Sequence, residues 1–333
     1  MEIRKVQKTG GSSYVVTLPK DWIRSLGIKE KDSLALVTQP DGTILVSADI
    51  NRDKTKRNKE INIERDTDVN YLIRSLIGSY IMGFTTIKIC SNSKKFNPRI
   101  RRSILDFIRS VIGFEIIDET LNTLTIKDLL NPSEMPFDKS IKRMDISVRT
   151  MHEDAILALK NKDVMLVNDV LVRDIEINRR YRLIARQSNM ILHDVVLAQK
   201  MGVSLEDAHH YFLISKQLER VGDHAKNIAR SVLELIKNDL NDDLIENISE
   251  ASKFSLNSLK NCLEAWAKRD LSMAHDNIEK TRKLRKMCEK ITHSAVENPE
   301  ISVALSYIAE SIGRTGEYAI NIAEIVFDNL LKD

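Results

Sequence analysis

The sequence is poor in cysteine and has no long apolar run. Its three cysteines, Cys90, Cys262 and Cys288, are scattered and form no Cys-x-x-Cys pair. Isolated cysteines in odd number are atypical of a disulfide framework or a thiolate zinc site. No stretch of 18 apolar residues occurs, and the first residues lack the apolar core of a signal peptide. We therefore expect a cytoplasmic protein that is neither secreted nor inserted in a membrane.

An excess of charge of one sign is also nearly lacking. The chain has 51 basic and 48 acidic residues and a net charge of +3, so no global field selects a partner. The small excess is local, because residues 1–59 hold 12 Lys and Arg against 7 Asp and Glu. The length of 333 residues is enough for two or three domains. We expect a basic N-terminal module joined to a near-neutral remainder.

Two stretches in the second half of the chain are almost alike. Residues 220–229 and 314–323 are offset by 94 residues, and seven of their ten positions match in identity or charge type. An internal duplication is the simplest explanation. Gly222 and Gly316 interrupt an otherwise helical pattern, at a cost of roughly 1 kcal/mol each relative to alanine. Their presence in both copies indicates close helix packing or a bound group near the backbone.

The N-terminal 50 residues alternate apolar and polar positions with period two, which is typical of short strands. Pro19 and Gly27 bracket a short helix, and Pro40-Asp41-Gly42 favours a hairpin turn. The predicted strands are 3–8, 14–18, 33–38 and 43–46. Four short strands and two helical turns bury little surface, so we expect this module to dimerise.

The residues of this module resemble the SpoVT/AbrB swapped-hairpin family over positions 1–50. The matching pieces, in order, are Arg4-Lys5-Val6-Gln7, Gly10-Gly11-Ser12-Ser13, Val15-Val16-Thr17-Leu18-Pro19-Lys20, Trp22, Leu26-Gly27 and Asp32. The resemblance implies an interleaved β-barrel homodimer that binds DNA through basic residues on its early strands and loops.

Seven residues are the candidate DNA contacts: Arg4, Lys5, Lys8, Ser12, Ser13, Lys20 and Arg24. A two-fold axis would duplicate the five cations into a repeated set that neutralises phosphates. The serines and amides of the Gly10–Ser13 turn could position a phosphate oxygen. The alternative is a solvated strand face with ordinary lysines. A nucleotide-binding loop is rejected, because no Gly-Lys-Ser/Thr follows the glycines.

The next part of the chain divides into a connection and a small α/β segment. Residues 51–65 are rich in Lys, Arg, Asp and Asn and are predicted to be a linker. Residues 66–130 alternate between helical and strand patterns and are predicted to form an α/β unit. Its expected elements are helices over 69–82 and 98–112 and strands near 86–90, 115–117 and 123–126. We find no chemical constellation there, and a solvated helix face explains Arg101, Arg102 and Arg109 better than a nucleic-acid surface.

Long amphipathic helices fill the remainder, in two copies over residues 139–238 and 243–331. Long helices with short joins indicate antiparallel bundles. The predicted helices are 139–161, 164–199 and 204–238 in copy one, and 243–268, 271–296 and 299–331 in copy two, and an interruption of 164–199 is left open. The turns Lys162-Asp163 and Arg269-Asp270 hold equivalent places, and copy one carries about 13 extra residues near Gly202.

The motif Glu219-Arg220-Val221-Gly222-Asp223-His224-Ala225 and the following Asn227-Ile228-Ala229 resemble the signature of PhoU three-helix domains. In that family, acidic pairs spaced by four on facing helices are implied to hold metal ions. Carboxylate oxygens suit a divalent or iron-type metal. The carried-over ligands are Glu219 and Asp223, faced by Asp174, while Asn178 stands where the second facing acid is expected.

Two alternatives limit the expected metal site. Glu219 and Asp223 could instead be an exposed i,i+4 acidic pair, or intrahelical partners of Arg220 and Lys226. In copy two, Gly313 replaces the first acid and Glu317 keeps the second. The facing pair there is Glu279 and Lys283 in one register, or Thr281 and Arg285 in the other. Either register puts a cation among the ligands, which argues against metal in copy two. We interpret His209, His210 and His224 as polar surface residues.

These features together predict a multidomain fold: an AbrB-like swapped-hairpin β-barrel, a small α/β segment, and tandem all-α three-helix bundles. The expected function is a cytoplasmic, dimeric, DNA-binding regulator of phosphate uptake whose bundles sense phosphate status or bind a partner. The alternative is an adaptor that docks on a phosphate transporter or sensor kinase and uses the barrel only to dimerise. An enzyme is not expected, since no nucleophile with a base and no complete metal cage can be assembled.

Overall fold

The computed structural model describes the chain except residues 1, 39–41, 49–56, 298 and 332–333. The chain divides into two compact units, residues 1–56 (unit 1) and residues 57–333 (unit 2), and each is described by itself. No helix in the described part of the chain is both long enough and apolar enough to span a bilayer.

Unit 1 contains the predicted order of strand, strand, short helix, strand, strand. Its elements are β1 (Gln7–Thr9), β2 (Ser13–Val15), α1 (Lys20–Ser25), β3 (Ala35–Thr38) and β4 (Ile44–Ser47). β1 pairs antiparallel with β2, and β3 with β4, in two separate two-stranded sheets. Gly10 and Gly11, with φ of 59° and 82°, turn the chain between β1 and β2. The hairpin turn expected at Pro40 and Asp41 lies outside the described residues.

The described residues of unit 1 form no core of their own. None of them is buried, and many apolar side chains of the strands and their neighbours face solvent. Ile3 is 83% exposed, Tyr14 72% and Leu36 68%. The expected barrel therefore does not close within the described residues of one chain, since the two hairpins share no sheet. Strands this short cannot cover one another's apolar faces.

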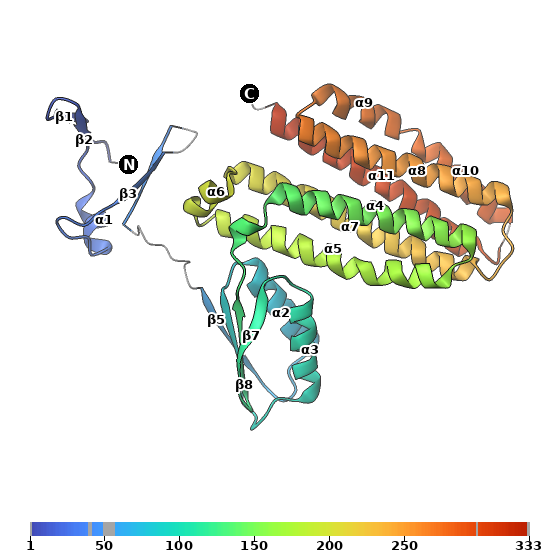
Figure 1. The fold of residues 1–333 in the computed structure, drawn as a ribbon, viewed down its shortest axis with the longest axis horizontal. Coiled ribbons are helices and arrows are strands. Elements are labelled where there is room, and N and C mark those ends of the chain that lie inside the picture. Colours follow the sequence, from blue (N-terminus) through green and yellow to red (C-terminus); the bar gives the residue numbers. More distant parts are fainter. Residues whose placement is uncertain (1, 39–41, 49–56, 298, 332–333) are drawn as a thin grey trace. The chain divides into compact units, whose positions relative to one another are not determined.

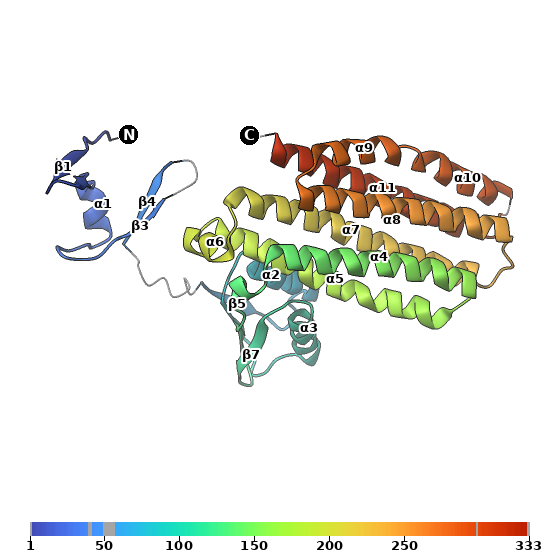
Figure 2. The same ribbon diagram turned by 45° about the horizontal axis from the view of Figure 1, so that its top comes forward.

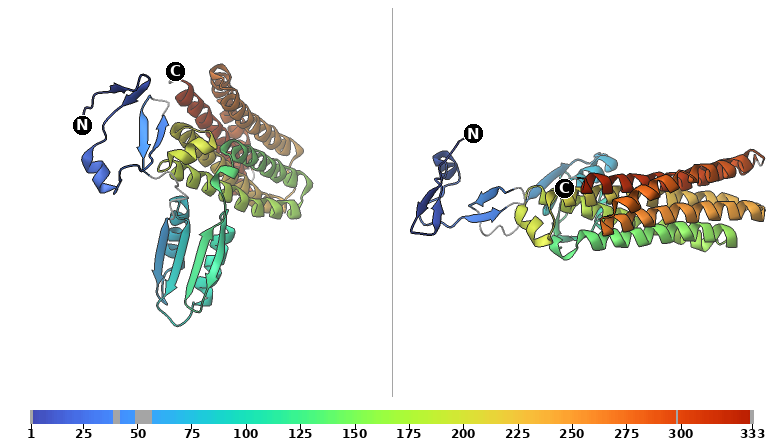
Figure 3. Two further views of the ribbon diagram at one scale, coloured as in Figure 1. Left: turned by 60° about the vertical axis from the view of Figure 1, so that its left-hand side comes forward. Right: turned by 90° about the horizontal axis from the view of Figure 1, so that it is seen from above.

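The first part of unit 2 is a four-stranded sheet with two helices on one face (Figures 1 and 3). The strand order is β5-β6-β8-β7, with β5 parallel to β6 and the other pairs antiparallel. The elements are β5 (Asn58–Ile63), α2 (Val69–Ile81), β6 (Thr86–Ser91), α3 (Pro98–Arg109), β7 (Phe114–Glu119) and β8 (Thr123–Asp128). Leu72, Leu76 and Tyr80 of α2 are buried against strand residues such as Ile87 and Leu124.

Strand β5 corrects the predicted linker over residues 51–65. Residues 58–63 pair along their whole length with β6. Only Ile61 and Ile63 of this edge strand are apolar, and they pack on the core while its polar residues face water. An edge strand with one solvent-exposed face has few apolar residues, so its sequence is hard to distinguish from that of a polar linker.

The helical half contains the predicted tandem bundles, shown side by side in Figure 2. Copy one contains α4 (Phe137–Asn161), α5 (Val164–Ile191), α6 (Val195–Met201) and α7 (Leu205–Leu235), after a 3-10 turn, η1 (Pro132–Glu134). Copy two contains α8 (Asp242–Lys268), α9 (Leu271–Thr281), α10 (Leu284–Glu297) and α11 (Ser302–Leu330). The short helix α6 accounts for the extra residues expected near Gly202. The middle helix of copy one is interrupted after Ile191, as the sequence pattern allows, whereas the break in copy two after Thr281 is not expected from the sequence.

The duplication is visible in the turns as well as in the helices. Lys162 and Arg269 both end their helices in the left-handed conformation, with φ of 54°. The next residues, Asp163 and Asp270, each cap the following helix by accepting a hydrogen bond from a backbone N–H three residues on. The two bundles also share one continuous apolar core, so they fold against each other.

Histidines lie in the seam between the two copies. His152 of α4 is fully buried, with Nδ1 2.9 Å from the Ser252 hydroxyl of α8. His210 is buried with Nδ1 2.9 Å from the Asn329 amide, and half-buried His224 lies 3.2 Å from the Ser311 hydroxyl. The interpretation of His210 and His224 as surface residues is therefore wrong, because the second copy covers them. His209 is exposed, as expected.

Acid is expected to weaken this seam. Burial, and secondly the charge of His224, lower the pKa of His152 to about 3. An unfolded histidine has a pKa near 6.5. Below that pH the unfolded state binds a proton that native His152 does not, so the free energy of unfolding decreases as the pH is lowered. We expect His152 to contribute a loss of about 2 kcal/mol between pH 7 and pH 5. Guanidinium denaturation at both pH values should show a smaller loss of unfolding free energy for His152→Asn than for the wild type. Equal falls would show that His152 is not the acid-sensitive group.

Three arginines of α5 fasten the α/β part to copy one. Arg179 donates to the carbonyl of Val111 at 3.3 Å, and Arg182 to that of Ser110 at 2.8 Å. Arg186, further along α5, donates to the carbonyl of Tyr80 and pairs with Asp128 at 2.6 Å. The carbonyls belong to the C-terminal ends of α2 and α3, where unpaired carbonyls and the helix dipole favour cations.

Candidate functional sites

The predicted DNA contacts of unit 1 are all exposed, on three successive segments. Lys8 lies on β1 opposite Tyr14, while Lys20 begins α1 and Arg24 lies in its last turn. Arg4 pairs with Glu2, and Arg24 lies 4.0 Å from Asp21. Among the described residues, no ion pair engages Lys5, Lys8 or Lys20. Their role at DNA stays a prediction, since no contact joins these cations into one cluster within a single chain.

The Gly10–Ser13 turn presents its two serines to solvent. The Ser12 amide donates to the Gly10 carbonyl at 3.1 Å, and Ser13 pairs with Thr9 across the hairpin. Both serine side chains are exposed. A phosphate could reach them, but their contact with DNA is likewise a prediction.

In copy one, Asp174 is the buried centre of the expected acidic group. This residue of α5 is 4% exposed, and its Oδ2 accepts from Lys226 Nζ of α7 at 2.6 Å. Asn178 Nδ2, one turn along α5, donates to the same oxygen at 3.2 Å. The other oxygen, Oδ1, is buried and has no partner among the described residues. Asp174 is therefore engaged by a cation from the facing helix.

Glu219 and Asp223 lie on α7 near Asp174. Burial, the charge of Asp223 and that of Asp174 raise the pKa of Glu219. Burial and the charge of Asp174 also raise the pKa of Asp223, although this side chain is largely exposed and water screens its share. The three acids are therefore close enough to influence one another's charge, and their role as metal ligands stays a prediction.

The side chains as placed do not fit the expected metal. Within the part of the chain that the structure describes, no three His, Cys, Asp or Glu residues are arranged to hold one ion. The carboxylate at the centre of the group is already engaged by an ammonium and an amide. Helical spacing predicts that Lys226 partners the acids of its own helix. The structure shows its ion pair with Asp174 of the facing helix instead.

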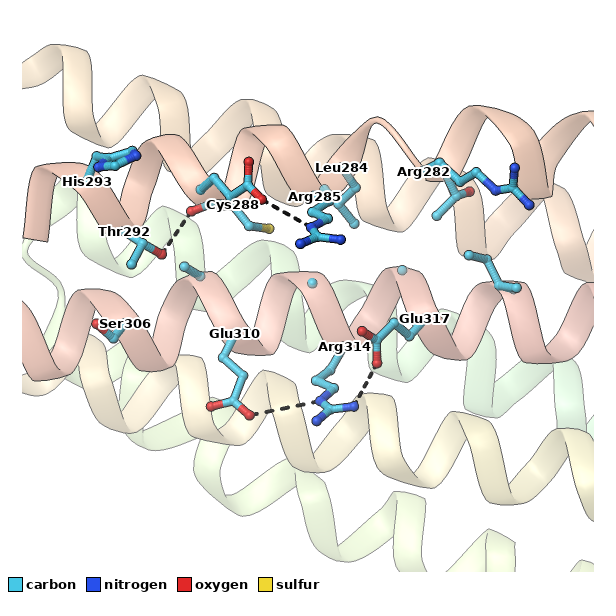
Figure 4. Close-up of a pocket in the computed structure, with 16 residues that line it drawn as sticks. Arg282, Leu284, Arg285, Cys288, Thr292, His293, Ser306, Glu310, Arg314 and Glu317 are labelled. Atoms are coloured by element: carbon cyan, nitrogen blue, oxygen red, sulfur yellow. Dashed lines mark hydrogen bonds and ion pairs between the residues drawn. The ribbon is translucent and has the colours of Figure 1, made fainter.

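The equivalent place in copy two is a groove of about 970 Å³ between α10 and α11 (Figure 4). Thr281 and Arg285 line it together with Gly313 and Glu317, whereas Glu279 and Lys283 do not. The structure therefore selects the register in which Thr281 corresponds to Asp174 and Arg285 to Asn178. Arg285 is the cation that this register predicts in the groove, and it pairs with Glu289 at 3.1 Å.

The paired glycines admit side chains of the middle helices. A Cβ added at Gly222 would come within 3.3 Å of Ile177, and one at Gly316 would overlap Leu284. Ile177 and Leu284 correspond in the same register, so the contact is repeated in both copies. Of the two explanations for the glycines, close helix packing is the one that the structure shows.

Alanine substitutions at two nearby glycines of α11, Gly313 and Gly316, should change the stability of the protein in opposite directions. A Cβ at Gly313 would meet only Cys288 Sγ at 3.6 Å, so Gly313→Ala should stabilise by up to about 1 kcal/mol through helix propensity. Gly316→Ala gains the same propensity but overpacks buried Leu284, at a cost of about 1–3 kcal/mol. Thermal unfolding should place Gly313→Ala above the wild type and Gly316→Ala below it. The reverse order would refute the packing role.

A comparison with protein families decides the classification of the helical half. The family model for the PhoU domain matches residues 141–232 and 248–326, one copy after the other. The chain belongs to the PhoU family. A second model, described as antidote-toxin recognition MazE, bacterial antitoxin, matches residues 7–62. The N-terminal module of this PhoU-family chain is thus a MazE/AbrB-like domain, as its residues implied.

Known relatives match the helical half. The phosphate-specific transport system accessory protein PhoU homolog of Caulobacter vibrioides is 28% identical over 193 residues, covering 56% of this chain and 83% of the relative. The homolog of Rhizobium meliloti is 25% identical over 196 residues, covering 57% and 81%. The crystal structure of PhoU from Pseudomonas aeruginosa aligns with a TM-score of 0.52 and 20% identity, over 59% of this chain and 95% of that one. This last likeness confirms the fold of the bundles.

Proposed function

We propose that this PhoU-family regulator of phosphate transport acts as a dimeric DNA-binding protein that controls genes of phosphate uptake. The observation that carries the proposal is the joining of a MazE/AbrB-like module to two PhoU domains in one chain. The helical half supplies the link to phosphate transport, which its relatives' names state for them. The basic module supplies a means of reaching DNA.

The exposed apolar strands of unit 1 support dimerisation. Val6, Tyr14 and Val16 near the first hairpin and Leu36 and Ile44 in the second are all at least half exposed. Side chains of this size on short strands need a covering surface. A second copy of the module offers the same strands and would complete a barrel around them.

The cations of unit 1 support binding to DNA rather than to a neutral partner. Lys5, Lys8 and Lys20 are exposed and have no described acidic partner, so their charge is available to a polyanion. In a dimer each cation appears twice, and every phosphate neutralised releases counterions. Phosphate contacts of this kind fix position, and sequence is then read by other contacts in the grooves.

The PhoU bundles would supply the response to phosphate status, directly or through a transporter subunit or sensor protein. Regulation requires two states of the bundles that differ in their effect on the paired DNA-binding modules. We propose no chemical step for the chain, and the expectation that it is not an enzyme stays a prediction.

A second candidate function is an adaptor that docks on a phosphate transporter and uses unit 1 only to dimerise. The names of the relatives favour it, because they describe accessory proteins of a transport system. An adaptor would bind transporter-containing vesicles with no preference for DNA.

The two functions are separated by a salt titration with full-length protein. Fluorescence anisotropy with duplex DNA from upstream of phosphate-transport genes should give an association constant that falls with salt, with a log–log slope of about −4 or steeper. A slope near zero, or no binding at low salt, would leave the adaptor as the function.

A further inference from the structure

The acidic group of copy one contains its own cation. We propose that the Lys226 ammonium takes the place of a metal ion in copy one, so that a side chain of α7, and not a bound metal, holds α7 to α5. The proposal concerns the helical half alone and is independent of DNA binding by unit 1.

Asp174 and Lys226 form an ion pair between α5 and α7. The Asp174 side chain is 6% exposed, and that of Lys226 is 25% exposed, so the 2.6 Å ion pair lies largely out of water. Asn178 donates to the oxygen that Lys226 engages. A metal ligand needs a free lone pair directed at the ion, and a cation at 2.6 Å opposes a second cation at the same oxygen. Lys226 must therefore leave before Asp174 can bind a metal through Oδ2.

The other two acids also have basic neighbours. The charges of Arg182 and Arg220 act on Glu219, and those of Lys226 and Arg230 act on Asp223. Arg182 is itself fixed by its hydrogen bond to the Ser110 carbonyl. These basic residues offset part of the negative charge of the group, and two of them, Arg182 and Lys226, contact other elements.

Copy two gives an independent comparison. In the register that the structure selects, the counterpart of Asp174 is Thr281, and the counterpart of Lys226 on α11 is Ile320. The acid and the lysine are both present in copy one and both absent in copy two. Thr281 is 3% exposed and bonds Ser258 and the Asn277 carbonyl, so the site needs no cation. Asp174 and Lys226 are expected to occur together or not at all if the role of the lysine is to neutralise the aspartate.

The second carboxylate oxygen of Asp174 could accept a further ligand. Asp174 Oδ1 is buried and has no partner among the described residues. A water molecule would satisfy it, and so would a metal ion. The test must therefore measure metal content and stability together.

The test uses full-length wild type, Lys226→Met and a control, Lys237→Met, which removes an exposed i,i+3 pair with Glu234. Each protein is incubated with Mn²⁺, Fe²⁺ or Mg²⁺, desalted, analysed for metal and melted with and without EDTA. We expect the wild type to hold far less than one metal per chain and to melt unchanged in EDTA. Lys226→Met should melt at least about 5 °C lower, because Asp174 loses its counter-ion. Lys237→Met should melt as the wild type does.

Without the Lys226 ammonium, the acidic group of copy one should bind a metal ion. Adding Mn²⁺ should raise the melting temperature of Lys226→Met but not that of Lys226→Met/Asp223→Asn, which lacks a ligand. Wild type that retains about one metal per chain and melts lower in EDTA would overturn the proposal. So would a Lys226→Met protein as stable as the control. If Lys226→Met fails to fold, the wild-type metal content and Lys226→Arg, which should stay metal-free and stable, decide the question.

Discussion

Changing Lys5, Lys8 and Arg24 to glutamate is expected to lower the affinity of the full-length protein for DNA by about 1,000-fold near 100 mM salt. All three side chains are exposed, and Arg24 has only a 4.0 Å contact with Asp21. A dimer carries each change twice, so six cations at the phosphate backbone become six anions. Fluorescence anisotropy with one labelled duplex measures the loss.

A matched variant separates this effect from net charge. Lys280, Lys283 and Lys286 are exposed on and between α9 and α10, outside unit 1. Their reversal to glutamate changes the charge of the protein by the same amount and should leave the affinity within about threefold of the wild type. An equal loss in both variants would mean that DNA responds to total charge. No loss in the first variant would refute the assignment of DNA binding to these residues.

Arg186→Met is expected to lower the free energy of unfolding by about 3–5 kcal/mol. The Arg186 side chain is 2% exposed and pairs at 2.6 Å with Asp128, which is 7% exposed. It also donates to the Tyr80 carbonyl and lies over the rings of Tyr80 and Phe114 at 4.9 and 5.3 Å. Methionine fills similar space but leaves a buried carboxylate without a counter-charge. Chemical denaturation measures the change.

The exposed pair of the same α/β part provides the comparison. Arg101 makes two hydrogen bonds to Glu119, at 2.7 and 3.1 Å, but these side chains are 46% and 34% exposed. Arg101→Met should cost less than about 1 kcal/mol. Arg186→Met/Asp128→Leu should recover part of the loss, because both charges are then gone. Similar costs for Arg101→Met and Arg186→Met would contradict the claim that Arg186 anchors the α/β part to α5.

Local patterns predicted much of the fold because the physical causes are local. Apolar periodicity, the aspartate caps at Asp163 and Asp270 and the left-handed ends at Lys162 and Arg269 all act within a few residues. The glycines of the repeated motif indicate tight packing or a bound group, and the contacts with Ile177 and Leu284 show packing. Helical spacing also placed Glu219 and Asp223 on one face.

Other features depended on neighbours that no local pattern specifies. His210 and His224 contact residues of the second copy. The sequence around a polar residue does not show whether another domain will bury it. Strand β5 is recognisable only beside β6. Helical spacing identifies Lys226 as a partner for the acids of α7, but its ion pair is with Asp174 of α5, 52 residues earlier, and no local pattern specifies that pairing.

The central claim is that unit 1 directs this PhoU-family protein to particular DNA, and a ratio of two affinities tests it most directly. Full-length protein is titrated at about 150 mM salt with duplexes from upstream of phosphate-transport genes and with shuffled duplexes of the same composition. A sequence-specific regulator should bind one of the upstream duplexes roughly 1,000-fold or more tightly than its shuffled form. Equal affinity for every upstream duplex and its shuffled form would contradict the claim.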